Sequence, residues 1–313
     1  MKPEILLIEP MMPPIEERLD ASCTVHRLYR AVDRAAFLDE IGPNVRAIVT
    51  GGATGASNEL VAALPALEII AINGIGTDAV DLADARARGL RVTTTPDVLT
   101  DDVADLALGL LLATARQVSL GDRFVRSGHW ARKDRLPLGR KVSGKRLGVL
   151  GMGRVGRAIA RRAEAFGLEI AYNDLRAFDD LPYRHEPDLK ALARASDFLV
   201  IAAAGGPQSR GIVDAAVLDA LGPDGILVNV ARGSVVDEPA LVAALVEGRL
   251  GGAGLDVFVA EPDVPEALWA LDQVVLQPHQ ASATVETRIA MGELVLANLA
   301  AHFAGQEPVT PVV

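Results

Sequence analysis

Three polar residues in the second half of the chain have types and positions suited to chemistry on a carbonyl group. Arg232, Glu261 and His279 each come shortly after an apolar run of strand-like residues. Because the carboxyl ends of parallel strands lie along one edge of a sheet, we expect these side chains to converge there. An arginine fork binds carboxylate and carbonyl oxygens, and histidine exchanges its proton near neutral pH. A carboxylate beside the imidazole fixes its tautomer and favours its charged form, which is the role expected for Glu261.

Each of the three residues also has an ordinary structural explanation when it is taken singly. Arg232 fits a surface turn, Glu261 a loop charge before Pro262, and His279 a satisfied polar group after Pro278. Their joint position beside a nucleotide-binding motif favours function. The other histidines are expected to be structural, on surface or arm segments: His26, His129, His185 and His302.

That motif lies between Lys145 and Asp174, where a strand-like run is followed by G-x-G-x-x-G and a helical pattern. Gly151 allows a sharp turn, Gly153 lets a pyrophosphate approach the backbone, and Gly156 allows close packing of helix and strand. The phosphates then lie on free N–H groups at the N-terminus of the following helix. Arg154 and Val155, which lie between the second and third glycines, are therefore also expected to bind the cofactor.

Asp174 ends the next apolar run, at about the offset expected for an acid that binds the adenosine ribose hydroxyls. An ionised Asp174 repels a 2′-phosphate, which favours NAD as cofactor. Arg176 lies two positions further on and can reach a 2′-phosphate, so NADP stays open as the alternative. Beside a nicotinamide, Arg232, Glu261 and His279 form the set that hydride transfer to a 2-oxo acid requires.

Strand-like and helical segments alternate along the whole chain, which predicts an α/β protein with two doubly wound parallel sheets. The strands of the first sheet are expected at 5–8, 47–50, 69–72 and 92–94, and those of the second at 146–150, 168–172, 198–203, 226–230, 254–258 and 274–276. Helices are expected at 57–64, 80–88, 157–166, 187–195, 214–221 and 238–247. The final amphipathic segment, 284–303, can pack back on the first domain.

The composition limits the class of partner. The 313 residues carry a net charge of −10, which argues against nucleic-acid binding and favours small metabolites. The single cysteine, Cys23, excludes an intramolecular disulfide and a thiolate metal cluster, and fits a reducing cytoplasm. The longest apolar run, 106–115, is too short to cross a bilayer. We therefore expect no metal site and no membrane association.

A helix capped by Asp101 or Asp102 is expected from Val103 to about Val118, followed by a basic, irregular segment from Arg123 to Arg146. That segment is either a solvated arm or an intersubunit arm with Trp130 as its anchor.

Several stretches closely resemble the D-isomer-specific 2-hydroxyacid dehydrogenases, in the branch of glyoxylate, hydroxypyruvate and hydroxyphenylpyruvate reductases. The likeness covers nearly the whole chain. The stretches are GIGTDAVD from Gly74, GMGRVG from Gly151, NVARGSVVDE from Asn229, GGAGLDVF from Gly251 and PHQASAT from Pro278.

The resemblance implies a homodimer whose Rossmann nucleotide domain, residues 99–282, is inserted in a flavodoxin-like substrate domain made of 1–98 and 283–313. It implies that Arg232 binds substrate, that His279 is the acid/base and that Glu261 pairs with it. The backbone of Ile75 and Gly76 would hold the substrate carboxylate. Asp256 would face the nicotinamide amide, and Trp130 would lie in the dimerisation arm.

The chain departs from the family pattern at Ala204–Gly206, where relatives usually have a proline-containing stretch. The main functional alternative is a corepressor-like protein that senses NAD(H) without turnover; the absence of a long disordered tail and of a basic DNA-binding segment argues against it. Formate oxidation lacks support in the pocket motifs. The loop from Glu9 to Pro14 can line the substrate pocket, although core packing accounts equally well for Met11 and Met12.

Overall fold

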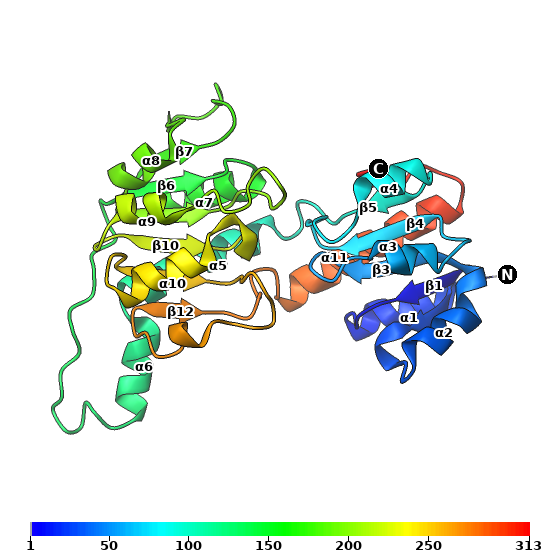
Figure 1. Ribbon diagram of the computed structural model, residues 1–313, viewed down its shortest axis with the longest axis horizontal. Coiled ribbons are helices and arrows are strands. Elements are labelled where there is room, and N and C mark those ends of the chain that lie inside the picture. Colours follow the sequence, from blue (N-terminus) through cyan, green and yellow to red (C-terminus); the bar gives the residue numbers. More distant parts are fainter. Residues whose placement is uncertain (1) are drawn as a thin grey trace. The chain divides into compact units, whose positions relative to one another are not determined.

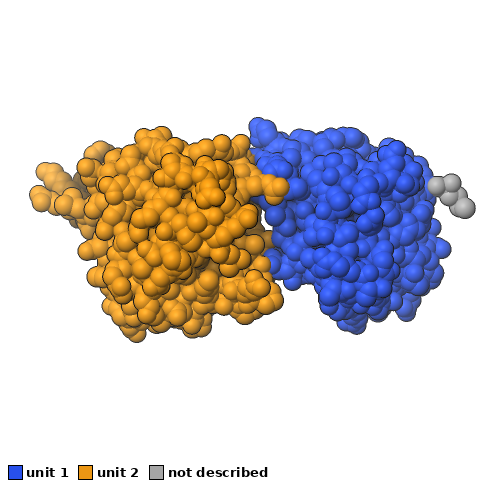
Figure 2. All heavy atoms as spheres, turned by 90° about the horizontal axis from the view of Figure 1, so that it is seen from above, with its two compact units in different colours: residues 1–99, 283–313 blue, residues 100–282 orange. Residues whose placement is uncertain are grey.

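The computed structural model describes residues 2–313, which form two compact units, each with its own parallel sheet (Figure 1). Unit 1 comprises residues 1–99 and 283–313, and unit 2 comprises residues 100–282 (Figure 2). The expected fold class, two doubly wound α/β domains with a Rossmann domain inserted in a flavodoxin-like one, is confirmed by both sheets.

Unit 1 has five parallel strands in the order β2-β1-β3-β4-β5. One sheet face packs on α1 and α11 through Ile5, Leu7, Leu19, Val295 and Leu299. The other face packs on α2, α3 and α4. The strands are β1 (Glu4–Leu7), β2 (Thr24–Arg27), β3 (Val45–Gly51), β4 (Ile69–Asn73) and β5 (Arg91–Thr93). The helices are α1 (Pro13–Ser22), α2 (Arg34–Ile41), α3 (Asn58–Ala62), α4 (Leu82–Ala87) and α11 (Val285–Phe303).

Unit 2 has seven parallel strands in the order β12-β11-β10-β9-β6-β7-β8. Helices α8, α9 and α10 cover one face, while α5 packs closely on β10 and β11 because β11 carries glycines. A Cβ on Gly254 would lie 2.9 Å from the Cβ of Leu110 in α5. The strands are β6 (Arg146–Leu150), β7 (Glu169–Asn173), β8 (Arg184–His185), β9 (Phe198–Ile201), β10 (Ile226–Asn229), β11 (Gly252–Leu255) and β12 (Val274–Leu276). The helices are α5 (Thr100–Ala115), α6 (Val118–Arg126), α7 (Arg154–Glu164), α8 (Leu189–Ala195), α9 (Ala215–Leu221) and α10 (Glu238–Val246).

Five α-helices and strands were not expected from the sequence: α1, β2, α2, α6 and β8. Helix α1 opens with two prolines, which favour a helix start, but it buries only Ile15 and Leu19, too few for a clear helical period. Strand β2 is an edge strand whose residues are exposed or half-buried, so the apolar signal of a strand is missing.

Several expected boundaries were wrong; helix α7, for example, begins at Arg154 and not at Arg157. Helix α5 begins at Thr100, so Asp101 and Asp102 lie in its first turn and act on the helix dipole, not as caps. Strand β11 ends at Leu255, and residues 256–258 belong to the loop that follows. The helix expected to reach Val118 ends at Ala115, because Gln117 has a left-handed φ of 55° that breaks it.

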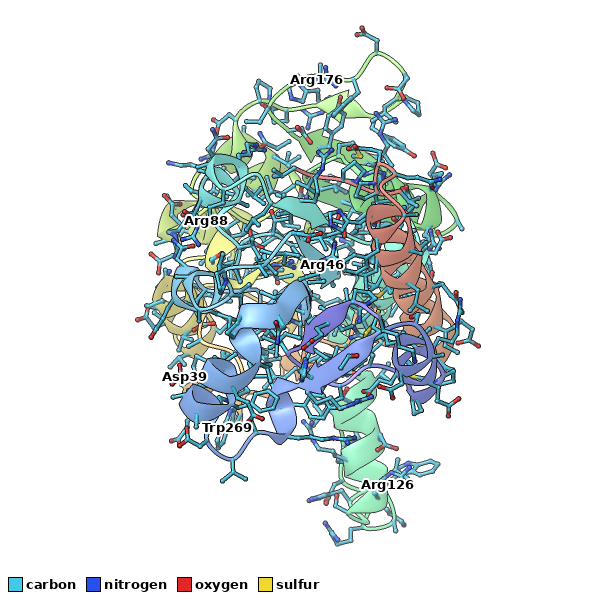
Figure 3. The ribbon with its side chains drawn as sticks, turned by 90° about the vertical axis from the view of Figure 1, so that its right-hand side faces the viewer. Asp39, Arg46, Arg88, Arg126, Arg176 and Trp269 are labelled. Atoms are coloured by element: carbon cyan, nitrogen blue, oxygen red, sulfur yellow. The ribbon has the colours of Figure 1, made fainter. Side chains whose placement is uncertain are left out.

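Helix α6 begins after that break, at Val118, and no residue in it is buried. Its last residues, 123–126, belong to the segment expected to be irregular. It carries Arg126, which pairs with Asp122 (Figure 3). The segment that follows leaves Trp130 70% and Leu138 95% exposed. No single helix within residues 2–313 is long and apolar enough to span a membrane; the bent pair α5 and α6 passes that test together, by length and composition only.

Candidate active site

Arg232, Glu261 and His279 belong to the loops after β10, β11 and β12, which are neighbours in the sheet of unit 2. All three loops therefore leave the same edge of the sheet. The loop of Arg232 packs directly on the loop of Glu261. A Cβ on Gly233 would lie 2.0 Å from the carbonyl carbon of Phe258, which shows how closely the two backbones approach. Only glycine at position 233 permits this approach.

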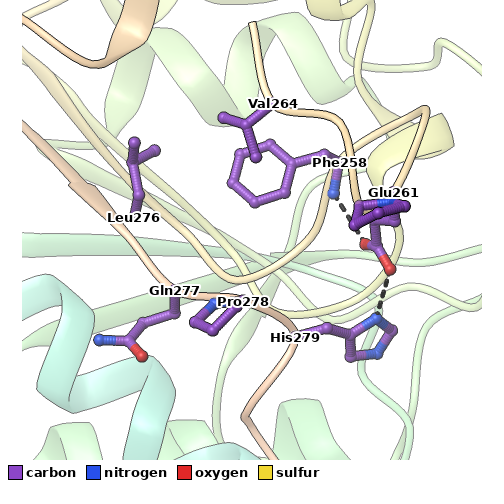
Figure 4. A pocket seen from close by; sticks show the side chains of 8 residues that line it. Phe258, Glu261, Val264, Leu276, Gln277, Pro278 and His279 are labelled. Atoms are coloured by element: carbon purple, nitrogen blue, oxygen red, sulfur yellow. Dashed lines mark hydrogen bonds and ion pairs between the residues drawn. The ribbon is translucent and has the colours of Figure 1, made fainter. Parts of the chain in front are cut away.

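His279 and Glu261 form a hydrogen-bonded ion pair (Figure 4). The His279 Nδ1 atom lies 2.7 Å from Glu261 Oε2, and the other carboxylate oxygen accepts a 2.9 Å hydrogen bond from the Phe258 N–H. A carboxylate accepts and does not donate, so Nδ1 carries the proton of the pair. The Nε2 atom takes no part in this contact.

The pKa of Glu261 is lowered from its ordinary value. Burial by itself would raise it, but hydrogen bonds from His279 and the Phe258 N–H and the charges of His279 and Arg232 outweigh burial. Glu261 thus remains a carboxylate at neutral pH, as a partner that favours the imidazolium must.

A buried carboxylate holds the turn that carries His279. Asp256 is fully buried, and its two oxygens accept hydrogen bonds from the N–H groups of Gln280 at 2.7 Å and Ala281 at 2.9 Å. The His279 N–H donates to the Asp256 carbonyl oxygen at 2.8 Å, with His279 at a left-handed φ of 54°. Few non-glycine residues adopt this conformation, so the surrounding hydrogen bonds must impose it.

Burial raises the pKa of Asp256 above its ordinary range, although the two N–H groups and the charge of His279 act in the opposite direction. Both oxygens of its side chain accept hydrogen bonds from the backbone of the His279 turn. The resemblance implies that this residue also faces the nicotinamide amide, which stays a prediction; it does not indicate the role in the turn.

Asn229 has a comparable role for Arg232, which sequence reasoning missed. It is 1% exposed, its Nδ2 donates to the Arg232 carbonyl oxygen at 2.9 Å, and its Oδ1 accepts from the Ala231 N–H at 3.0 Å. The amide clamps the turn that presents Arg232. Its position as a polar residue ending an apolar strand is the signal that could have identified it.

Behind the pair lies a mainly apolar pocket of about 260 Å³ (Figure 4). Its lining residues are Phe258, Glu261, Pro262, Val264, Leu276, Gln277, Pro278 and His279. Within residues 2–313 no group of three potential metal-ligating side chains occurs.

The glycine motif has the geometry of a phosphate cradle. Gly151 has a φ of 91°, and a Cβ on Gly156 would lie 2.0 Å from the Gly151 carbonyl oxygen. Gly153 precedes α7 with open space where a Cβ would be, and no side chain caps the first N–H groups of this helix. The N-terminus of α7, with Arg154 and Val155, therefore fits a dinucleotide pyrophosphate.

Asp174 lies just beyond β7 and holds the glycine turn. Its Oδ2 accepts a 2.7 Å hydrogen bond from the Met152 N–H, and its Oδ1 accepts from the Leu175 N–H at the same distance. Arg176 lies on the exposed loop that follows (Figure 3), with its guanidinium 5.2 Å from the ring centre of Phe178. The structure thus keeps a carboxylate beside the cradle and Arg176 stacked on an aromatic ring.

Ile75 and Gly76 lie in unit 1, in the loop after β4, where Ile75 is 39% exposed. This loop packs on the loop after β3: a Cβ on Gly52 would lie 3.4 Å from the Gly76 nitrogen. The other histidines pair with nearby groups: His26 with Glu4, His129 with Asp134, His302 with Glu68, and His185 with the Asp174 carbonyl oxygen.

Comparison with known proteins agrees with this geometry. Residues 108–281 match the profile described as "D-isomer specific 2-hydroxyacid dehydrogenase, NAD binding domain". The chain is 48% identical to a 2-ketogluconate reductase of Gluconobacter oxydans, covering 100% of this chain and 99% of the relative. It is also 48% identical to a hydroxyphenylpyruvate reductase of Plectranthus scutellarioides, covering 99% and 98%.

A solved structure of an NADPH-dependent glyoxylate/hydroxypyruvate reductase from Sinorhizobium meliloti, in complex with NADP and malonate, superposes with a TM-score of 0.94 at 45% identity, over 100% of this chain and 97% of that one. These relatives are named as reductases and lend no support to the corepressor-like alternative. The profile match, the full-length identity and the two parallel-sheet units together show that the chain belongs to the D-isomer-specific 2-hydroxyacid dehydrogenases, which are NAD(P)-dependent oxidoreductases.

Proposed function

We propose that the protein reduces small 2-oxo acids of the glyoxylate and hydroxypyruvate type to D-2-hydroxy acids. The observation that carries this proposal is the His279–Glu261 pair, which joins the loops after β12 and β11, beside the Arg232 loop after β10, along one edge of the nucleotide-binding sheet. Steady-state reduction of glyoxylate and hydroxypyruvate, followed by cofactor absorbance, tests it. A purified protein that bound the dinucleotide but reduced neither acid would contradict it.

In the proposed reaction His279 is the general acid. Its Nε2 donates a proton to the substrate carbonyl oxygen. A dinucleotide held at the turn from Gly151 to Gly156 would supply the hydride. Glu261 holds the imidazole through Nδ1 and stabilises its charged form before the transfer. Asp256 acts as a positioning residue, because it shapes the turn that aims the imidazole.

Arg232 is proposed to bind the substrate carboxylate and to polarise the carbonyl group with its planar fork. The N–H groups of the loop at Ile75 and Gly76 are proposed to hold the carboxylate from unit 1. In this assignment unit 1 is the substrate domain and unit 2 is the dinucleotide-binding domain.

Replacing Glu261 with glutamine should move the alkaline limb of the kcat profile for reduction to lower pH, because the carboxylate that favours the charged imidazole is lost. The profile is measured with saturating substrate from pH 5 to 9. A lower rate with an unmoved limb would mean that Glu261 only orients the ring.

The same variant carries a stability prediction with a definite sign. The pKa of Glu261 is lowered in the folded protein. Its contribution to the free energy of unfolding is therefore fully present above the unfolded-state pKa and is lost as the pH falls through the folded-state pKa. The difference in Tm between wild type and Glu261→Gln should therefore shrink on acidification. A difference that grew toward acid pH would contradict the assigned charge state.

NAD is proposed as the preferred cofactor, on the basis of Asp174. Replacing Asp174 with serine should shift the ratio of kcat/KM for NADH over NADPH by about tenfold toward NADPH, since a contact charge repulsion near a surface exceeds 1 kcal/mol. The exposed neighbour Asp179, changed to serine, is the matched control. A wild type that already preferred NADPH would overturn the assignment.

A homodimer is proposed as the assembly, with the arm formed by α6 and the segment around Trp130 as its interface. Val118, Val125, Trp130 and Leu138 expose apolar surface there, which an isolated chain rarely does over one projecting segment. Light scattering should give twice the chain mass, and Trp130→Asp should shift it toward one chain mass. A monomeric wild type would contradict this interface.

A reducing cytoplasm is proposed as the compartment, because Cys23 is a free, buried thiol.

A further inference from the structure

Glu9 lies at the topological switch point of the unit 1 sheet, where the connections that follow β1 and β3 run to opposite sides. In the order β2-β1-β3-β4-β5, β1 connects to β2 on one side and β3 connects to β4 on the other. Ligands of open parallel sheets bind beyond the carboxyl ends of the strands at such a switch point. Glu9 follows β1 at that edge, and the catalytic assignment above makes no use of it.

The structure makes room for the Glu9 carboxylate. A Cβ on Gly51, at the end of β3, would lie 2.0 Å from Glu9 Oε1, so the carboxylate occupies the space that a side chain at position 51 would take. Glu9 Oε2 accepts a 2.6 Å hydrogen bond from the Thr54 hydroxyl. Within residues 2–313 no hydrogen bond reaches Oε1, and Glu9 is only partly buried. One carboxylate oxygen is held and the other is available.

The sheet face around Glu9 changes from apolar to polar at this edge. Leu7, Val49 and Ala71 belong to the core between the sheet and α11, and the same face continues two residues later with Glu9, Gly51 and Asn73. The Asn73 Oδ1 atom is buried without a hydrogen-bond partner, as is the hydroxyl of Thr95, which is 0% exposed. Unpaired buried polar atoms are rare and call for a partner or a functional reason. Packing alone does not account for this polar edge.

The distance from Glu9 to the proposed carboxylate loop fits a long substrate. Gly51 lies against Glu9 and the next residue, Gly52, lies against Gly76, so the two sites are at most on the order of 10 Å apart. A chain of about six carbons is long enough to reach both. The negative charge of Glu9 repels a substrate carboxylate and accepts hydrogen bonds from hydroxyl groups.

We propose that Glu9, with Asn73 beside it, forms a subsite for the hydroxyl groups of polyhydroxylated 2-oxo acids, so that the protein selects sugar-acid substrates over apolar acids of the same length. This inference rests on the proposed 2-oxo acid reductase function. It assigns the chemistry of the far end of the substrate, which the acid/base set leaves open.

The test compares kcat/KM for 2-keto-D-gluconate with that for 2-oxohexanoate, which has the same carbon chain without hydroxyls. Glu9→Leu should lower the ratio of the two at least about tenfold, mainly through KM for the hydroxylated acid, because a hydrogen bond to a charged group is lost. Glu9→Gln, which keeps an acceptor, should lower it less. The exposed helix residue Glu17, changed to glutamine, is the control and should leave the ratio unchanged.

Gly51→Ala provides a second variant that keeps the carboxylate. The φ of Gly51 is not in the left-handed region, and the three heavy atoms nearest to the new Cβ all belong to the end of the flexible Glu9 side chain. The fold should therefore tolerate the alanine while Glu9 is displaced. The same fall in the ratio is expected. Equal losses on both acids, or an unchanged ratio in the Glu9 and Gly51 variants, would overturn the subsite. A wild type that reduced no 2-oxo acid, glyoxylate included, would overturn the proposed function instead.

Discussion

Replacing His279 with glutamine should lower kcat for glyoxylate reduction by about 10³-fold, because a positioned general acid contributes on the order of 10² to 10⁴ in rate. Glutamine can still donate a weak hydrogen bond to the carbonyl oxygen but cannot release a proton to it. KM should change little, since substrate binding is assigned to Arg232 and the loop after β4. Single-turnover and steady-state assays with NADH measure both quantities.

His302→Gln is the matched control, because His302 also pairs with a glutamate, Glu68, at 3.0 Å, and lies on α11 in unit 1. It should retain wild-type kcat. The variant at His279 should also lose the pH dependence that the general acid imposes on reduction. If His279→Gln kept most of the wild-type kcat, another group would have to supply the proton and the assignment of the pair would be wrong.

Arg232→Gln is the second large effect and should lower kcat/KM by about 10²- to 10⁴-fold. Two charge-assisted hydrogen bonds are lost, each contributing about 1.5–3 kcal/mol, and about 1.4 kcal/mol corresponds to a factor of ten. Arg232→Lys should recover only part of the loss, because an ammonium keeps the charge without the planar fork. Saturation kinetics with glyoxylate separate the rise in KM from the fall in kcat.

Arg249→Lys is the corresponding control, since its guanidinium pairs with Glu247 and Asp219 on the surface of unit 2. It should leave kcat/KM within a factor of two, as surface ion pairs contribute about 0–1 kcal/mol. An Arg232→Lys enzyme as active as wild type would show that charge alone is sufficient. An Arg232→Gln enzyme with normal KM would remove Arg232 from substrate binding.

The strands and helices that were predicted correctly are those whose whole segment shows one clear local pattern. Buried parallel strands such as β6 and β10 are continuous apolar runs, and helices such as α9 and α10 begin at an aspartate whose side chain caps the first turn. Such signals depend on neighbours in the chain and survive without tertiary information. The family resemblance rests on motifs around Gly151, Arg232 and His279, and the match to the family and the full-length relatives confirmed it.

The missed elements share a physical cause. Helix α2 buries only Ile41, and β8 has two residues, neither of them buried. Edge elements bury little surface, so their sequences carry a weak period. Their conformation is stabilised by the strand or helix on which they pack, which is distant in the chain.

Residue types and their spacing were sufficient to predict that Arg232, Glu261 and His279 follow strands, that a dinucleotide cradle precedes them, and that the chain alternates strand and helix. The folded chain was needed to show that Glu261 meets His279 at 2.7 Å, that buried Asp256 shapes the His279 turn, and that Gly51 makes space for Glu9. Those contacts join residues far apart in the chain, and their distances are set by how the loops pack at the sheet edges.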